Sequence, residues 1–403
     1  MKRPAPPWTT TALAGLYLGA ALFTCACGSR EAGAARRTLY FAGEPVARIA
    51  ERASVGGGAR HVTRTATLEQ SGETTELRAT LDAQGFALAA RYTRGALRAV
   101  DLSDLAGLRD PTRAPVVLID LLGHVQPRAP TAVLLVDLAS AEQVPGTVER
   151  RGAEIAALDA FGFVVARANV EGHRTGPGVF FEGDSAPATP RVPVEIEAPS
   201  PAGVRAWRAT GINDVVAALT ADGPGQHRVG DVLVRTPAPG LAPPSAAASA
   251  PEPFVESADT RVVAWAGALA AGDDAMARTA RLVEAIHPMV DASKGALPPA
   301  AVVMLEHGGD CDGAAALLTA GLRALGTPAR PVVGYRWVDG RFLPHAWTEV
   351  WTPGGWLVAD ATVPRIGDDA SYLKLFEGLG GALTMGRVLG RLHLHPTSAP
   401  GAP

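Results

Sequence analysis

Cysteine is scarce in this sequence, with three residues in a chain of 403. Three cysteines are too few to build a disulfide framework, so a fold held together by several such bridges is excluded. Cys25 and Cys27 lie near the N-terminus, and Cys311 is the only cysteine beyond them. Stability must therefore come from hydrophobic cores, which a composition of 47% hydrophobic and 19% charged residues can supply.

An excess of positive charge is also lacking. Lysine and arginine number 37 against 40 aspartates and glutamates, for a net charge of −3. Nothing in this balance points to a nucleic-acid partner or to an anionic membrane surface. The length of 403 residues suggests two or three domains.

The apolar N-terminal run is short. Residues 11–23 form a 13-residue apolar stretch that follows Lys2 and Arg3. A membrane-spanning helix needs about 20 such residues, so this run is typical of an export signal.

The residues after this run resemble the cleavage box of bacterial lipoproteins. Cys27 follows the small Ala26 and precedes Gly28 and Ser29, which suits lipidation, with Cys25 as the alternative. A plain secretory signal with incidental cysteines is the other reading. Lipidation predicts an envelope protein anchored to a membrane and facing the periplasm or the exterior. Cys311 would then be its one free thiol, for which a reactive role fits an oxidising compartment.

The part of the chain that follows is predicted to be rich in strands. Residues 38–110 alternate with a period of two and are interrupted by glycine-rich turns, which favours an antiparallel sheet with one solvent-facing side. Apolar runs that are consistent with buried strands follow at 115–122, 131–138, 161–168 and 191–197.

A segment rich in proline, alanine and serine at 236–253 gives the clearest domain boundary. We therefore expect an α+β protein with a mainly antiparallel β region before this linker and a separate domain after it. The predicted parts are a signal peptide (1–27), a tether (28–37), the β region (38–235, with two subdomains as an option), the linker (236–253), the C-terminal domain (254–394) and a tail (395–403).

The C-terminal domain shows helical spacing first and strands afterwards. The pattern predicts helices at 259–272, 275–287, 299–307 and 311–325, and strands at 330–338, 341–351 and 356–363. Asp339-Gly340 is a favourable hairpin turn between the first two of these strands.

Cys311 lies at the predicted start of a helix, directly after Gly308-Gly309-Asp310. The first N–H groups of a helix have no internal partner, and their partial positive charge favours ionisation of a thiol there. The same N–H groups can help to bind an oxyanion.

His345 and Asp360 supply the other two parts of thiol acyl-transfer chemistry. If Trp351 faces Trp356 across the turn, Asp360 lies opposite Trp347, and His345 is its diagonal neighbour on the same face. A shift of one residue would place them on opposite faces of the sheet, so the register is a specific requirement.

Each of these residues also has an ordinary structural interpretation, as a small buried cysteine, a packed histidine and a carboxylate at a strand end. A zinc site with His307 as an extra ligand is a further alternative, but no second cysteine lies nearby.

Residues from about 275 to 377 resemble the core of the transglutaminase-like superfamily. The resemblance depends on Gly309-Asp310-Cys311-Asp312, on residues 325–334, on His345-Ala346-Trp347-Thr348-Glu349-Val350, on Gly355-Trp356 through Asp360-Ala361-Thr362, and on residues 369–375. It implies a papain-like α+β core in which Cys311 is the nucleophile, His345 the base and Asp360 the orienting acid. Some members of the family carry an upstream tryptophan that assists the oxyanion, and Trp265 is the only candidate in this domain.

The sequence therefore predicts an exported thiol enzyme that acts on amide bonds of proteins or peptides through a thioester and needs no cofactor. Hydrolysis is favoured over the alternative of cross-linking or amine transfer at glutamine. A non-catalytic binding module that keeps the same groove is the third possibility. Neither the substrate nor the oligomeric state can be deduced from the sequence.

Overall fold

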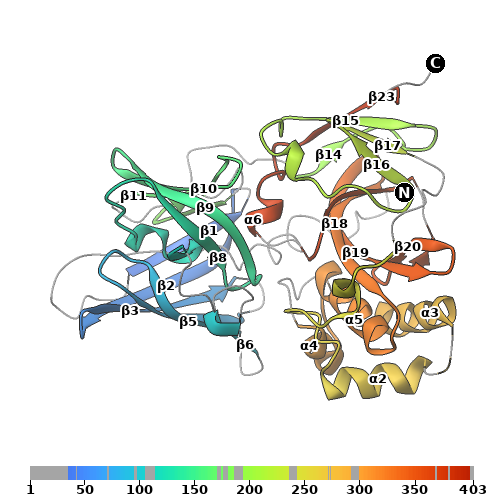
Figure 1. Ribbon diagram of the computed structural model, residues 1–403, viewed down its shortest axis with the longest axis horizontal. Helices are drawn as coiled ribbons and strands as arrows, with labels where there is room; N and C mark the ends of the chain where they lie inside the picture. Colours follow the sequence, from blue (N-terminus) through green and yellow to red (C-terminus); the bar gives the residue numbers. More distant parts are fainter. Residues whose placement is uncertain are drawn as a thin grey trace. The chain divides into compact units, whose positions relative to one another are not determined.

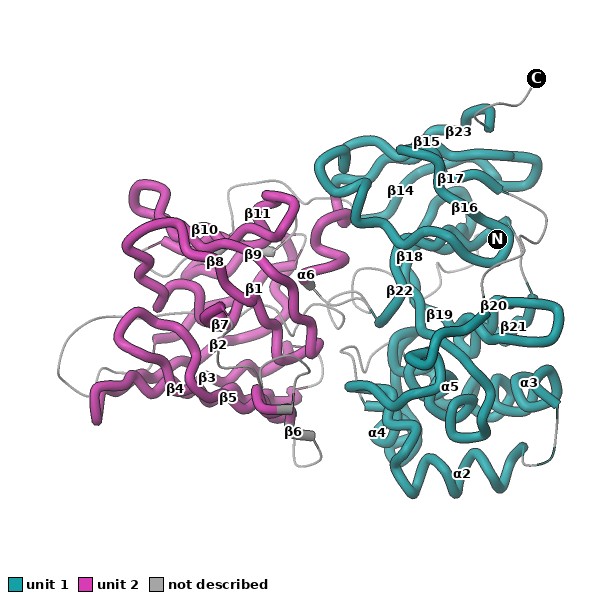
Figure 2. Tube along the Cα trace, viewed as in Figure 1, with its two compact units in different colours: residues 1–16, 194–380, 391–403 teal, residues 17–193, 381–390 magenta. Residues whose placement is uncertain are grey.

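The computed structural model describes residues 35–41, 43–69, 72–94, 98–104, 114–169, 174–175, 180–185, 194–235, 243–270, 272, 274–291, 299–367, 370–379 and 382–399. The described residues form two compact units, which are coloured separately in Figure 2. Unit 1 contains Val194–Gly380 and Arg391–Pro403, and unit 2 contains the described residues before Val194 together with Gly381–Gly390. Each unit combines strands that are mainly antiparallel with helical segments, so the predicted α+β class is confirmed.

Unit 2 is built on one sheet, in which thirteen strands can be followed within the described residues. Their order is β6-β5-β4-β3-β2-β1-β13-β12-β11-β10-β9-β8-β7, and only the β7–β8 pair is parallel (Figure 1). The strands are β1 (Ala35–Phe41), β2 (Glu44–Gly56), β3 (Ala59–Leu68), β4 (Thr74–Leu81), β5 (Ala87–Arg94), β6 (Arg98–Asp101), β7 (Val116–Leu118), β8 (Thr131–Asp137), β9 (Glu142–Arg151), β10 (Glu154–Asp159), β11 (Val164–Asn169), β12 (Arg174–Thr175) and β13 (Phe180–Gly183).

The alternation of the sequence determines which face of this sheet is buried. On β3, Val62, Ala66 and Leu68 are buried while the threonines between them lie on the other face. The predicted strand at 115–122 is only partly correct. Its apolar run forms β7 and then continues as a 3₁₀ helix, η2 (Ile119–His124), which is also buried. A short apolar run does not distinguish a buried strand from a buried helical turn.

A charged network lies inside this apolar face. The side chain of Arg64 is fully buried and donates to Glu51 at 2.9 Å and to Glu182 at 3.2 Å. His124 contacts the other oxygen of Glu51 at 3.1 Å. These partners compensate for the burial of charge, which is costly when unpaired.

Unit 1 contains the four helices and the hairpin that the sequence predicted. They are α2 (Thr260–Ala270), α3 (Ala275–Ile286), α4 (Ala300–Glu306), α5 (Cys311–Ala324), β18 (Ala329–Val338), β19 (Arg341–Thr352) and β20 (Gly355–Asp360). Gly326 ends α5 with φ of 74°, and the β18–β19 turn has positive φ at both Asp339 and Gly340. A short 3₁₀ turn, η5 (His287–Met289), follows α3.

These strands belong to a sheet ordered β21-β20-β19-β18-β22, with β14 beside β19, six strands in the described part of the unit. The added strands are β14 (Ile196–Glu197), β21 (Arg365–Ile366) and β22 (Tyr372–Glu377). Helix α5, buried from Cys311 to Arg323, packs against β18 and β19 and is surrounded by α2, α3 and α4 (Figure 1). Central burial of α5 places its first residue, Cys311, beside the sheet.

A second sheet of unit 1 places the boundary between the two units before residue 194, not at the segment 236–253 that the composition indicated. Its described strands follow the order β16-β17-β15-β23, with β15 (Ala206–Thr210), β16 (Gln226–Val229), β17 (Val232–Arg235) and β23 (His393–Thr397). Residues 194–235, which the sequence assigned to the N-terminal β region, thus join the C-terminal unit. The predicted tail also contributes residues 395–397 to β23. Strands β15 and β23 are nearly 200 residues apart in the sequence, so local composition could not predict that they pair.

Short segments complete the two units. Leu383, on α6 (Ala382–Met385), joins the hydrophobic core of unit 2, and its backbone N–H donates to Glu142 at 2.8 Å. The remaining 3₁₀ turns are η1 (Leu102–Asp104), η3 (Val216–Ala218) and η4 (Ala246–Ser249). None of the helices in the described residues has the length and the apolar character that spanning a membrane requires.

Candidate active site

Cys311 is the first residue of α5, as predicted. The preceding helix α4 ends at His307, whose left-handed φ of 49° turns the chain back through Gly308 and Gly309. Asp310 is the N-cap, and its side chain accepts from the backbone N–H groups of Asp312 at 3.1 Å and Gly313 at 3.3 Å. These two bonds come from the second and third residues of α5.

The sulfur of Cys311 lies between the start of α5 and strand β19. Its Sγ donates to Oδ1 of Asp312 at 3.8 Å, and the backbone N–H of Ala346 donates to the sulfur. Ala346 directly follows His345 on β19, so the sulfur lies beside the backbone of the residue next to His345. Cys311 and His345 are 34 positions apart in the sequence, and the packing of α5 against β19 places their elements side by side.

The electrostatics around the thiol differ from the sequence-based expectation. Burial raises the pKa of Cys311 well above its ordinary value, and the carboxylates of Asp312, Asp310 and Asp360 raise it further. Burial and the neighbouring Asp310 likewise raise the pKa of Asp312 well above its ordinary value. The helix N-terminus alone would favour the thiolate, but desolvation and these carboxylates outweigh it. Both effects favour the protonated form of the thiol.

His345 and Asp360 form the pair that the hairpin register required. Trp351 is paired with Trp356 across the turn, with ring centroids 5.5 Å apart, and Thr348 is paired with Ala359. Nε2 of His345 lies 2.7 Å from Oδ2 of Asp360. When this nitrogen donates to the carboxylate, Nδ1 is left as the acceptor for a thiol proton.

Asp360 is held in its ionised form by several donors. Its Oδ1 accepts from the backbone N–H groups of Thr362 at 2.8 Å and Val363 at 3.3 Å, and its Oδ2 accepts from Tyr372 Oη at 2.8 Å. Burial opposes ionisation, but the charge and hydrogen bond of His345 and the hydroxyl of Tyr372 outweigh it and lower the pKa of Asp360. A buried carboxylate with these partners can orient the imidazole and stabilise its charged form.

Tyr372 is a part of the site to which the sequence reasoning gave no role. It lies on β22, is buried, and donates to the same carboxylate oxygen that faces His345. Its ring also packs edge-on against Trp347 with centroids 5.3 Å apart, and the Trp347 ring stacks on His345 at 6.2 Å. A tyrosine in an apolar strand predicts a hydroxyl that needs a hydrogen-bond partner. The sequence around Tyr372 does not indicate which carboxylate that partner is.

Gly334 explains how β22 comes so close. This residue lies opposite His345 in the β18–β19 pair. A Cβ added at Gly334 would lie only 2.1 Å from the backbone oxygen of Leu373, the residue after Tyr372. Because only glycine leaves room for that approach, Gly334 helps to place the Tyr372 hydroxyl on Asp360.

Trp265 does not complete an oxyanion site. Its ring lies against Gly321, where an added Cβ would be 3.1 Å from the tryptophan side chain. Gly321 is ten residues into α5, roughly 15 Å along the helix axis from Cys311. The backbone N–H at the start of α5 remains the candidate oxyanion donor.

The remaining candidates from the sequence lie elsewhere. Among the residues that the structure describes, no group of three or more His, Cys, Asp or Glu side chains is arranged to hold a metal ion, and His307 serves as the helix-ending residue of α4. Cys25 and Cys27 fall outside the described residues, so lipidation stays a prediction.

A scan against protein-family models finds a match at residues 265–361, described as the transglutaminase-like superfamily. This part of the chain is a transglutaminase-like domain. The match includes the helix of Cys311 and the hairpin that carries His345 and Asp360. The motifs indicated residues 275–377. The match starts ten residues before residue 275 and ends 16 residues before residue 377.

Comparison with solved structures gives more distant similarities. A candidate cysteine protease from Cytophaga hutchinsonii is 20% identical with a TM-score of 0.31, covering 39% of this chain and 53% of that one. The periplasmic domain of TgpA from Pseudomonas aeruginosa is 19% identical with a TM-score of 0.25, covering 53% of this chain and 72% of that one. The chain thus spans about half of the first of these structures. A search of curated proteins finds no match.

The two carboxylates near Cys311 predict a measurable effect on thiol reactivity. In Asp312→Asn, removal of one negative charge lowers the pKa of Cys311, so alkylation by iodoacetamide at pH 8 should be faster than in the native protein. The pH midpoint of labelling should also move down. The control is Asp274→Asn, which removes a carboxylate from the start of another helix, α3, and should leave labelling unchanged. Equal rates in all three proteins would contradict the assigned effect of Asp312.

Proposed function

We propose that this protein is an exported, lipid-anchored thiol enzyme that hydrolyses amide bonds of proteins or peptides through a thioester intermediate. The observation that carries the proposal is the 2.7 Å pair between His345 on β19 and Asp360 on β20. The N–H of Ala346, the residue after His345, donates to the sulfur of a cysteine at a helix start. The match of residues 265–361 to the transglutaminase-like superfamily supports cysteine chemistry in this part of the chain.

The raised pKa of the thiol defines the first step. Nδ1 of His345 removes the proton of Cys311 as the sulfur attacks the amide carbonyl, and Asp360 stabilises the imidazolium that forms. The N–H of Cys311 donates to the developing oxyanion. The partial positive charge at the start of α5 favours a negative charge at this position. Attack through a general base suits a site in which the resting thiol is neutral.

The second half of the reaction releases the products. The imidazolium of His345 gives its proton to the leaving amine as the carbon–nitrogen bond breaks, which leaves a thioester on Cys311. His345 then takes a proton from water, whose oxygen attacks the thioester carbonyl. The carbon–sulfur bond breaks to release a carboxylic acid, and the imidazolium returns its proton to the sulfur of Cys311. A primary amine in place of water would give a new amide, which is the chemistry of transglutamination.

The assay that tests the proposal follows the acyl group. The protein is incubated with a glutamine-containing peptide and with a panel of other peptides and cell-wall fragments, each with and without a primary amine. Hydrolysis predicts release of ammonia or a cleaved peptide at a rate that the amine does not change. Incorporation of the amine in preference to hydrolysis would favour transglutamination, and no turnover of any amide would favour a binding module.

The location is proposed from the N-terminal residues. The apolar run at 11–23 and the small residues around Cys27 support export and a lipid anchor in the cell envelope, with Cys25 as the second choice. Mass spectrometry of the mature N-terminus decides between them, since a diacylglyceryl group on Cys27 is expected and an unmodified N-terminus would contradict the anchor.

A further inference from the structure

Arg336 lies on β18, on the same face of the sheet as the active-site histidine. It is paired with Leu343 of β19, two residues before His345, so Arg336 and His345 are diagonal neighbours. On its other side it is paired with Tyr372 of β22. Its guanidinium carbon lies 5.8 Å from the centroid of the Tyr372 ring, whose hydroxyl donates to Asp360. Arg336 therefore borders the pair of His345 and Asp360.

The hydrogen-bond donors of Arg336 are not used by the protein. Its Nε is buried without a hydrogen-bond partner, and no carboxylate of the described residues forms an ion pair with its guanidinium. Burial raises the pKa of Asp360, while the charges of His345 and Arg336 lower it. The oxygens of Asp360 are occupied by His345, Tyr372 and two backbone N–H groups, so Arg336 acts on this carboxylate through its charge alone. The guanidinium can thus give its hydrogen bonds to a ligand.

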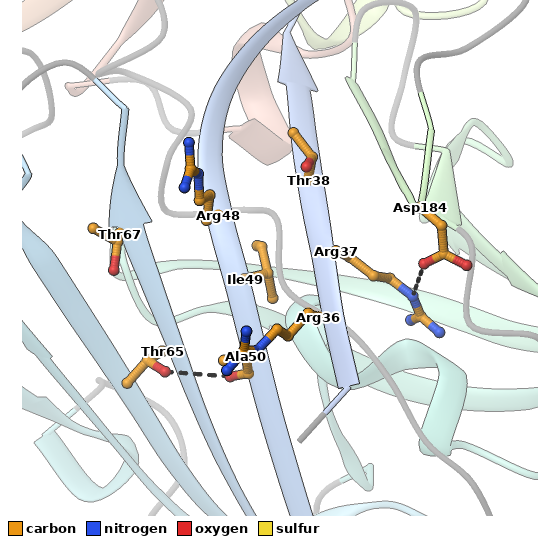
Figure 3. A pocket seen from close by; sticks show the side chains of 9 residues that line it. All are labelled: Arg36, Arg37, Thr38, Arg48, Ile49, Ala50, Thr65, Thr67 and Asp184. Atoms are coloured by element: carbon orange, nitrogen blue, oxygen red, sulfur yellow. Dashed lines mark hydrogen bonds and ion pairs between the residues drawn. The ribbon is translucent and has the colours of Figure 1, made fainter. Parts of the chain in front are cut away.

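The arginines of a pocket on unit 2 give the contrast (Figure 3). There Arg48 donates to Glu69 at 2.7 Å, and Arg37 lies 3.6 Å from Asp184. Carboxylates of the protein already balance these two charges. Arg336 differs because its positive charge stays available, and because it lies beside the active site.

A substrate can reach Arg336. Arg336 and His345 are both half-buried, whereas the neighbouring side chains of Trp347, Tyr372 and Asp360 are buried. In this group of side chains, the guanidinium and the imidazole are therefore the two parts that a bound molecule can touch.

The proposed mechanism indicates which part of the substrate lies there. His345 gives its proton to the leaving amine, so the amine side of the scissile bond lies next to the imidazole. Diagonal neighbours on a sheet are roughly 7–8 Å apart, which corresponds to about two residues of an extended chain at ~3.3 Å each. The group that meets Arg336 is therefore expected within about two residues of the scissile bond, on its amine side.

We propose that Arg336 binds a carboxylate that the substrate carries on the amine side of the scissile bond, within about two residues of it. This inference rests on the function proposed for Cys311. A guanidinium recognises a carboxylate by paired hydrogen bonds. In a peptide this carboxylate is either the free C-terminus or the side chain of an aspartate or glutamate.

Alkylation of Cys311 in the full chain by chloroacetylated peptides tests this site without turnover of an amide. One pair of probes is chloroacetyl-alanyl-alanine and its C-terminal amide, which tests a C-terminal carboxylate. The other pair is the α-amides of chloroacetyl-glutamic acid and chloroacetyl-glutamine, which tests a side-chain carboxylate. Mass spectrometry follows the rate of labelling, and each rate is divided by that of the same probe with mercaptoethanol.

The measured quantity is the ratio of the acid rate to the amide rate within each pair. In the native protein the ratio is expected to be about ten in at least one pair, as one charge-assisted hydrogen bond predicts, and that pair identifies the source of the carboxylate. Arg336→Gln should lower the ratio to about one. Arg336→Lys should give an intermediate ratio, because lysine keeps the charge but loses the paired donors.

Arg341→Gln is the matched control. Arg341 is half-buried on β19, on the same face as His345, but its guanidinium is already paired with Glu195 at 2.8 Å. This variant should keep the native ratio. An equal loss in Arg341→Gln, or a ratio near one for both pairs in the native protein, would overturn the proposal.

The ratio also separates substrate binding from an indirect effect on the reacting groups. If Arg336 served only to support Asp360, Arg336→Gln would slow the acid and the amide probe alike and leave the ratio unchanged, which would overturn the proposal. The function proposed for Cys311 fails in a different way. A preference for the acid probes that is lost in Arg336→Gln, in a protein that turns over no amide, would support the carboxylate site and contradict the hydrolase.

Discussion

Replacement of Cys311 by alanine is expected to abolish turnover, with a fall in kcat/KM of at least ~10⁴-fold, because a nucleophile has no substitute in covalent catalysis. The same change should remove the acyl-enzyme, which mass spectrometry of the native protein would detect as a mass increase on the peptide containing Cys311. The fold should survive, since alanine fits a buried position at the start of a helix.

Cys311→Ser is the companion variant. Serine keeps the size of the side chain and a proton for His345 to remove, but its hydroxyl is a far weaker nucleophile at neutral pH. Its activity should therefore be close to that of the alanine variant. Native-like turnover in either variant, with unchanged circular dichroism, would show that the reaction does not pass through the sulfur.

The second large effect is expected at Asp360. In Asp360→Asn the shape is retained, but the imidazole loses the charge that orients it and stabilises its protonated form. We expect kcat to fall by roughly 10⁴-fold, the size of effect known for the same change in a serine protease triad. Measurement of kcat and KM on the amide substrate identified for the native protein checks this expectation, and a fall confined to substrate binding would contradict it.

The same substitution should change the acid stability of the protein. Because the pKa of Asp360 is lowered in the folded state, its ionised form stabilises the fold above the unfolded value of about 3.9. This contribution disappears as the pH falls through the folded pKa. The difference in free energy of unfolding between native protein and Asp360→Asn should thus be largest at neutral pH and shrink below about pH 4. A difference that does not depend on pH would contradict the assigned ionised state.

Tyr372 provides a graded test of the same carboxylate. Tyr372→Phe removes one hydrogen bond to Asp360 and should lower kcat by about 10- to 100-fold, as expected for a hydrogen bond to a charged group. Tyr335→Phe is the matched control, since Tyr335 is buried on the neighbouring strand β18 and its hydroxyl donates to Val194 at 3.3 Å. An equal loss in both variants would indicate a general effect of lost tyrosine hydroxyls.

Much of the catalytic core could be predicted from local sequence. The start of α5 at Cys311 follows from its Gly-Gly-Asp turn and apolar helical spacing, and the hairpin follows from Asp339-Gly340 and the paired tryptophans 351 and 356. These signals concern residues close together in the sequence, where backbone preferences and hydrophobic periodicity act directly. They also determined that His345 and Asp360 share a face.

Other features of the site arise only from packing. The raised pKa of Cys311 depends first on the burial of the thiol and then on the charges of Asp312 and Asp310, and no residue pattern states how deeply a helix start is covered. The hydroxyl of Tyr372 reaches Asp360 because Gly334 allows β22 to approach β18. Trp265 was a candidate for the oxyanion site, yet its ring lies against Gly321. Long-range contacts of this kind depend on how elements pack in three dimensions.

The sequence by itself determined that this protein carries a cysteine at a helix start, a histidine and an aspartate on one hairpin, and an alternating β region before them. Only the tertiary structure decided that β15 pairs with β23 and that burial raises the pKa of the Cys311 thiol. The physical reason is that helices and turns form from nearby residues, whereas strand partners, burial and the fields of buried charges depend on residues far away in the chain.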